Sequence, residues 1–110
     1  MKGTNLGEFE ELVLLTIGAL GDDAYGVAIK EFISKKTNRK PSIGALHSAL
    51  NRLEKKGFLN IKIGEATKVR GGRRKKYYNI TIAGKEALSV INSLRSELFQ
   101  MIPNLNFSLS

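Results

Sequence analysis

Residues 59 to 82 constrain the fold of this chain more than any other segment. The sequence there reads LNIKIGEATKVRGGRRKKYYNITI, with two short runs of alternating apolar and polar residues around a central segment that lacks this pattern. Alternation with a period of two is typical of β-strands, and Gly64 and the pair Gly71-Gly72 supply residues suited to turns. The segment therefore predicts an antiparallel β-hairpin. Tyr77 and Tyr78 alternate across the second strand, so we expect one of them in the core.

The tip of this hairpin is strongly basic. Six cations and no acid lie between residues 66 and 76, so the cations repel one another unless a negative partner binds them. The six are Lys68, Arg70, Arg73, Arg74, Lys75 and Lys76. A phosphate backbone is the obvious partner, and a merely solvated loop is the alternative. A nucleotide-binding phosphate loop is disfavoured, because no Gly-Lys-Ser/Thr follows the glycine pair and its flanks read as strands.

Composition excludes several classes of protein. The 110 residues carry a net charge of +8 and are 42% hydrophobic, which suits one domain with its own core. With no cysteine and only His47 as histidine, we expect no disulfide, no metal centre, no cofactor and no catalytic nucleophile-base pair. The longest apolar stretch, residues 12 to 20, is too short to span a membrane, and the acids before it do not suit a signal peptide. We therefore expect a cytoplasmic protein that is not an enzyme and has no membrane partner.

Two helices are expected before residue 40. Residues 9 to 20 are apolar around most of a helix, which predicts burial on more than one side. Asp22 and Asp23 are suited to cap the second helix. Its predicted apolar stripe has helical spacing and consists of Tyr25, Ala28, Ile29 and Phe32.

A third helix is expected to begin after Ser42, a natural N-cap, and to close at Gly57. Its apolar residues recur at i, i+3, i+7 and i+10 and are expected to point inward; they are Ile43, Leu46, Leu50 and Leu53. The remaining face is small near the start of the helix and basic farther along.

Three helices followed by a basic hairpin indicate a winged helix-turn-helix, a mainly α fold with a two-stranded hairpin (α+β), over residues 1–82. In that fold the third helix enters the major groove of DNA, while a charged loop can rest on the backbone. The residues predicted to read bases are Ala45, Ser48, Asn51 and Arg52. Those predicted to contact the DNA backbone are Ser42, Gly44, His47, Lys55, Tyr77 and the six hairpin cations. His47 could equally be an ordinary surface residue.

A last helix is expected from about residue 83, capped by Thr81 and stopped by Pro103. Over residues 82 to 102 it would be roughly 30 Å long, more than so small a domain can cover, and its near-heptad apolar spacing suggests pairing with another helix. We therefore predict a homodimer, with residues 83–103 as the dimerisation helix and 104–110 as a flexible tail. The predicted interface consists of Leu12, Leu15, Ile91, Leu94, Leu98, Met101 and Ile102. Folding of this helix back onto its own domain is the alternative.

Several motifs taken together resemble the PadR family of bacterial transcriptional regulators, specifically its short subfamily with a single C-terminal helix. They are Ala24-Tyr25-Gly26, Ser42-Ile43-Gly44-Ala45-Leu46, Leu50-Asn51-Arg52-Leu53-Glu54-Lys55-Lys56-Gly57, and Gly71-Gly72-Arg73-Arg74-Lys75-Lys76-Tyr77-Tyr78-Asn79-Ile80-Thr81 with Gly84. The resemblance covers nearly the whole chain, and the last motif is its most specific part. It implies a homodimer held by the first and last helices, which binds a palindromic operator as a repressor and is often relieved by a small molecule.

The chain departs from this family pattern at two places. His47 and Ser48 stand where the family commonly has a tyrosine and a proline in the third helix, so a DNA contact of that tyrosine does not carry over. Some relatives bind flat aromatic drugs with a tryptophan of the last helix, near Leu94 or Arg95 here, and this chain has no tryptophan.

Three functions are compatible with the sequence. The leading one is a sequence-specific regulator of double-stranded DNA. A second is a sensor module whose main activity is binding a small hydrophobic effector in the dimer, with DNA binding secondary. A third is an RNA-binding winged helix, because attraction to phosphates alone does not distinguish nucleic acids.

Overall fold

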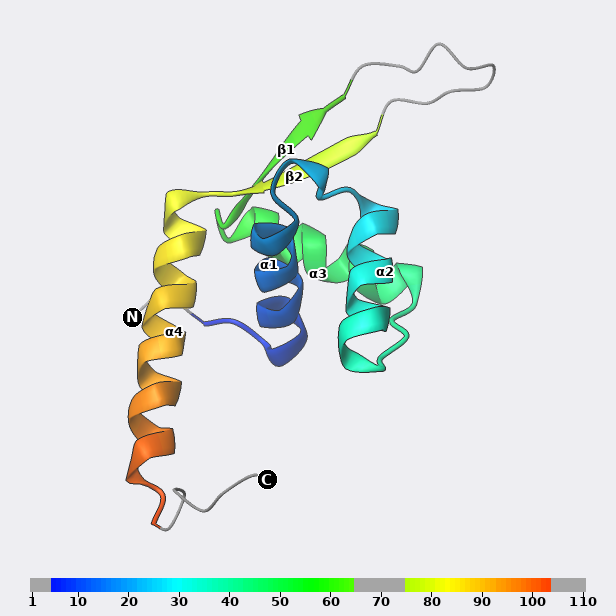
Figure 1. Ribbon diagram of the computed structural model, residues 1–110. Coiled ribbons are helices and arrows are strands. Elements are labelled where there is room, and N and C mark those ends of the chain that lie inside the picture. The colour runs from blue at the N-terminus through cyan, green and yellow to red at the C-terminus, as the bar shows by residue number, and fades with distance from the viewer. Residues whose placement is uncertain (1–4, 65–74, 104–110) are drawn as a thin grey trace, which may run out of the picture.

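The computed structural model describes residues 5–64 and 75–103, and within them it contains four α-helices and one β-hairpin (Figure 1). In chain order the elements are α1 (Glu8–Leu20), the 3₁₀ turn η1 (Gly21–Asp23), α2 (Gly26–Thr37), α3 (Ile43–Lys55), β1 (Leu59–Ile63), β2 (Lys76–Ile80) and α4 (Ile82–Met101). The predicted fold class, mainly α with a two-stranded hairpin, is confirmed.

Helix α1 occupies the centre of the molecule. Its side chains Val13, Leu14 and Ile17 are at most 1% exposed, and the helix contacts α2, α3, β2 and α4. The prediction that this helix is buried on more than one side is confirmed. It provides the support against which α3 and the hairpin are held.

Helix α2 differs from its prediction at its start. Residues 21 to 23 form a 3₁₀ turn, so the two aspartates are not its caps; Tyr25 is the N-cap residue, with extended backbone and no side-chain capping bond. The fully buried residues are Ile29 and Ile33, whereas Tyr25 and Phe32 are only partly buried. The buried stripe of α2 therefore differs from the predicted one. Tyr25 lies outside the helix, because it forms an isolated β-bridge with Tyr77.

The hairpin is antiparallel, as predicted, and pairs Leu59 with Ile80 at its base. Gly64 is not a turn residue, since its amide donates to the Lys75 carbonyl at 2.7 Å and so extends the ladder. A Cβ at Gly64 would lie 2.8 Å from the Tyr77 ring, which explains the glycine. Tyr78 is 5% exposed and Tyr77 is partly buried, which confirms the expected alternation. The pair Gly71-Gly72 lies outside the described residues.

Helix α4 packs on the domain through its N-terminal end, and farther along an ion pair between Arg95 and Glu11 joins it to α1. The Thr81 hydroxyl accepts a hydrogen bond from the Gly84 amide at 3.0 Å, which confirms the predicted cap, and donates to the Gly57 carbonyl at 2.7 Å. Gly84 and Ala87 are buried, but from Ser89 onward every described residue except the partly buried Ile91 is exposed. In Figure 1 the C-terminal half of α4 runs past the ends of the other helices.

Candidate nucleic-acid interface

Helix α3 shows a buried apolar face and an exposed face of small and polar residues. Ser42 caps it as predicted, because its hydroxyl accepts from the Ala45 amide at 3.0 Å. The buried face consists of Leu46, Ala49, Leu50 and Leu53. The exposed face contains the predicted contact residues Gly44, Ala45, His47, Ser48, Asn51, Arg52 and Lys55. Gly44, Ala45 and Ser48 add little side-chain bulk to this face.

Ile43 was expected to point inward, and this prediction is wrong. Its side chain is 53% exposed and lines a groove with Val27 of α2, itself 57% exposed. Ile43 is the first residue of α3, and the buried residues of the helix begin one turn later, at Leu46. The start of α3 therefore presents apolar surface next to its small residues.

The base of the hairpin is fastened to the start of α2. The Tyr78 amide donates to the Ala24 carbonyl at 2.8 Å, and the Tyr25 and Tyr77 rings meet edge to face with centroids 5.6 Å apart. The Lys75 Nζ lies 4.1 Å from the centre of the Tyr25 ring, a cation-π contact. These contacts fix the direction in which the hairpin leaves the body.

The hairpin and α3 meet beside a shallow cavity of about 270 Å³. It is lined by His47 of α3, by Lys75, Lys76 and Tyr78 of the hairpin, and by the start of α2. The structure thus brings together side chains that were predicted separately on the third helix and on the hairpin. Lys68, Arg70, Arg73 and Arg74 lie outside the described residues.

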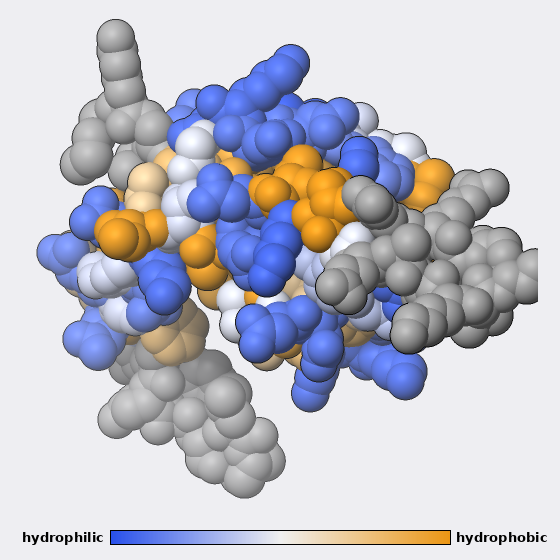
Figure 2. Space-filling model, turned by 90° about the horizontal axis from the view of Figure 1, so that it is seen from above, coloured by the Kyte–Doolittle hydropathy of each residue, from blue (hydrophilic) through white to orange (hydrophobic). Residues whose placement is uncertain are grey.

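The ion pairs of the described residues all use acids of α1. Glu8 pairs with Arg39 at 2.6 Å, Glu11 with Arg95 at 2.7 Å, and Glu10 with two cations of the α3 region. Within residues 5–64 and 75–103, no carboxylate lies within 4.0 Å of Lys55, Lys75 or Lys76. Lys55, Lys75 and Lys76 therefore have no acidic partner among the described residues. The hairpin side of the molecule is largely hydrophilic, with apolar patches between charged side chains (Figure 2).

Glu10 is a functional candidate that sequence reasoning missed. Its carboxylate accepts from Arg52 Nε and Lys56 Nζ, both at 2.6 Å, and from the Gly7 amide at 3.1 Å. Burial would raise the pKa of Glu10, but the bonds from Lys56, Arg52 and Gly7 outweigh it and hold the pKa below the ordinary 4.5. A signal was present, because Glu10 lies on the same helical stripe as Val13 and Ile17, where an unpaired acid would be costly.

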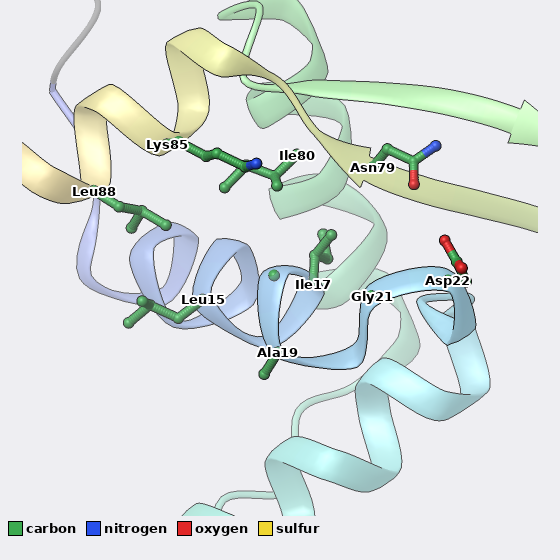
Figure 3. A pocket seen from close by; sticks show the side chains of 10 residues that line it. Leu15, Ile17, Ala19, Gly21, Asp22, Asn79, Ile80, Lys85 and Leu88 are labelled. Carbon is green, nitrogen blue, oxygen red and sulfur yellow. The ribbon is translucent and has the colours of Figure 1, made fainter.

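A second surface, away from α3, is apolar and uncovered. Leu15 of α1 is 49% exposed, and α4 exposes Val90, Leu94, Leu98, Phe99 and Met101, followed by Ile102. Of the residues predicted in the dimer interface, Leu12 packs against the core of its own chain and Ile91 is partly buried, whereas the others are exposed. A groove of about 600 Å³ runs between α1, β2 and α4, and Leu15 of α1 and Leu88 of α4 are among the side chains that line it (Figure 3).

Neither a membrane-spanning helix nor a metal-binding cluster occurs among the described residues. No helix there is both long and apolar enough to cross a membrane. No group of three or more histidine, cysteine or acidic side chains is placed to hold a metal ion in the same residues.

Comparison with known proteins gives a consistent picture. Residues 13–90 match the model of the "Transcriptional regulator PadR-like family". A Lysinibacillus sphaericus protein with the name "Uncharacterized protein X" is 34% identical over 98 residues, which cover 87% of this chain and 85% of that protein.

Solved structures share the fold. A PadR family transcription regulator from Clostridium difficile R20291 superposes with a TM-score of 0.72 at 24% identity, covering 86% of this chain and 93% of that one. A transcriptional regulator from Clostridium thermocellum has a TM-score of 0.69 at 28% identity, covering 89% and 92%.

Proposed function

Because the chain belongs to the PadR-like family of transcriptional regulators, we propose that it is a homodimeric repressor that binds a palindromic operator in double-stranded DNA. Membership of the family makes it a DNA-binding regulator rather than an enzyme. The observation that carries the finer proposal is the exposed face of small and polar residues on α3 beside Lys75 and Lys76 of the hairpin.

In this proposal α3 enters the major groove and the hairpin follows the phosphate backbone. Ala45 and Ser48 permit close approach, and Asn51 and Arg52 are long enough to reach base edges. Ser42, Gly44, His47, Lys55 and Tyr77, together with the hairpin cations, provide the sequence-independent contacts. Residues 1–82 then form the DNA-binding domain, and residues 83–103 form the dimerisation helix.

The dimer is supported by the apolar face of α4. A single recognition helix covers too few base pairs for selectivity, whereas two helices related by a twofold axis reach successive major grooves about 34 Å apart. Leu94, Leu98 and Met101 are each more than half exposed on a helix that its own domain does not cover. We propose that the partner's α1 and α4 cover them.

The groove between α1, β2 and α4 is the place we propose for a small hydrophobic effector. Its wall includes Leu15, Ile80 and Leu88 and it borders the uncovered face of α4, so a ligand there would alter how two copies pack. The spacing of the two α3 helices, and with it operator affinity, would change in consequence.

Selection of bound duplexes from a random DNA pool, followed by footprinting, tests the proposal. We expect an enriched sequence with two related half-sites protected about one helical turn apart. The Asn51→Ala variant should enrich the same sequence less strongly. A preference for RNA of equal length, or no enriched duplex, would contradict the proposal.

A further inference from the structure

The carboxylate of Glu10 joins the first turn of α1 to the last turns of α3. It is 6% exposed, and its two oxygens divide their partners: Oε2 accepts from Arg52, and Oε1 accepts from Lys56 and from the Gly7 amide. Lys56 is bound a second time, because its Nζ donates to the Asn5 carbonyl at 2.8 Å. Both bonds of the Lys56 ammonium therefore stabilise the fold, and the group is not available to contact a DNA phosphate.

Arg52 is held differently from Lys56. Only its Nε is bonded to Glu10, its side chain is 53% exposed, and no described residue accepts a hydrogen bond from Nη1 or Nη2. A guanidinium is a rigid planar fork, so one fixed Nε fixes the direction of the two free nitrogens. The result is a donor pair held in place before any ligand arrives.

We propose that Glu10 is a positioning residue for DNA recognition, which holds Arg52 so that its two free nitrogens meet a guanine in each operator half-site. The inference rests on the proposed function. Arg52 follows Ala45 and Ser48 at i+7 and i+4, so it shares their side of α3, where small side chains leave room for DNA. Guanine presents two acceptors in the major groove, O6 and N7, which an arginine fork can bind together. Because Arg52 is already ordered, less rotamer freedom is lost on binding.

The chain provides its own control in Glu8, two residues earlier on the same helix. Glu8 also pairs with an arginine at 2.6 Å, but that pair is open to solvent, with side chains 70% and 44% exposed, and it leads to Arg39 after α2. Arg39 also stacks over the Phe9 ring at 5.2 Å. Glu8→Gln and Glu10→Gln remove the same charge from the same turn, and only the second one touches α3.

The test compares dissociation constants for the selected operator and for a scrambled duplex. Glu10→Gln should reduce the ratio between them by about threefold to tenfold, the cost of re-ordering one long side chain. Binding to the scrambled duplex should be unchanged or tighter, because a negative charge is lost. Glu8→Gln should leave the ratio unchanged. An equal ratio for Glu10→Gln and Glu8→Gln would overturn the inference.

A double variant separates positioning from general support of the fold. If Glu10 acts through Arg52, then Glu10→Gln has no further effect on the ratio in an Arg52→Ala background. A continued loss in that background means that Glu10 acts by another route and overturns the inference.

Thermal unfolding shows whether Glu10→Gln folds. If it does not fold, the Arg52→Lys variant still tests the inference. Arg52→Lys retains the charge and can still pair with Glu10, but it has no free fork. It should lower the ratio while leaving the salt dependence unchanged, and an unchanged ratio would overturn the inference. Failure of the wild-type protein to select any duplex would instead contradict the proposed function itself.

Discussion

Replacement of Gly84 by alanine tests how closely α4 is fitted to the hairpin. A Cβ at this position would lie 2.6 Å from the Phe58 carbonyl oxygen and 2.9 Å from Cγ1 of Ile80. The carbonyl cannot move aside easily, because it accepts the Thr81 amide at 3.0 Å. The start of α4 must therefore shift by several tenths of an ångström, an overpacking that typically costs about 1–3 kcal/mol. The better helix propensity of alanine offsets about 0.5–1 kcal/mol of this cost.

We therefore expect Gly84→Ala to lower the free energy of unfolding by up to about 2.5 kcal/mol, with Tm falling by roughly 4–8 °C for each kcal/mol in a domain of this size. The matched control is Gly18→Ala in the last turn of α1, where an added Cβ meets no atom within 4 Å apart from its chain neighbours and the backbone of its own helix. That variant should gain about 0.5–1 kcal/mol. Thermal unfolding at one fixed protein concentration measures both. A Gly84→Ala protein stabilised as much as Gly18→Ala would refute the reasoning from this contact.

Three other perturbations address the surface, the interface and the ionisation of the protein. Replacing Arg73 and Arg74 by alanine should weaken binding to operator and random duplexes about equally. In a titration at several salt concentrations, the slope of log affinity against log salt should flatten by roughly 1 to 2 units per protomer. A loss of sequence preference with an unchanged slope would mean that the hairpin reads bases. Leu98→Glu should sediment as a monomer or unfold, because a buried unpaired charge costs several kcal/mol and occurs twice in a symmetric interface. A Leu98→Glu dimer that still binds its operator would disprove our assignment of the interface. The pKa of Glu10 is lowered on folding, so its stabilisation is complete above about pH 5 and is lost as the pH falls through the folded-state pKa. The difference in Tm between wild type and Glu10→Gln should shrink over that acidic range, and a constant difference would contradict the assigned ion pairs.

The sequence predicted the elements whose signals are local. Ser42 and Thr81 cap helices as expected, and Gly57 has the positive φ of 82° that its place after α3 requires. Tyr78 lies in the core because strand alternation has a period of two.

The errors arose where tertiary contacts override local preference. Tyr25 fits a helical stripe, but a bridge to Tyr77, more than fifty residues later, draws it out of α2. Ile43 has the right spacing for the core and nevertheless lies beyond the core's edge. Glu10 was read only as part of an acidic helix start, because its partners Arg52 and Lys56 are more than forty residues away.

The most direct test of sequence-specific recognition by α3 is a titration of the selected operator and a scrambled duplex at one salt concentration. The account predicts a preference of at least about a thousandfold for the operator. Asn51→Ala, a change at an exposed position of α3, should reduce that preference by about 1–3 kcal/mol while leaving the fold intact. Equal affinity of the wild-type protein for the two duplexes, or an undiminished preference in Asn51→Ala, would contradict the assignment of α3 as the reading surface.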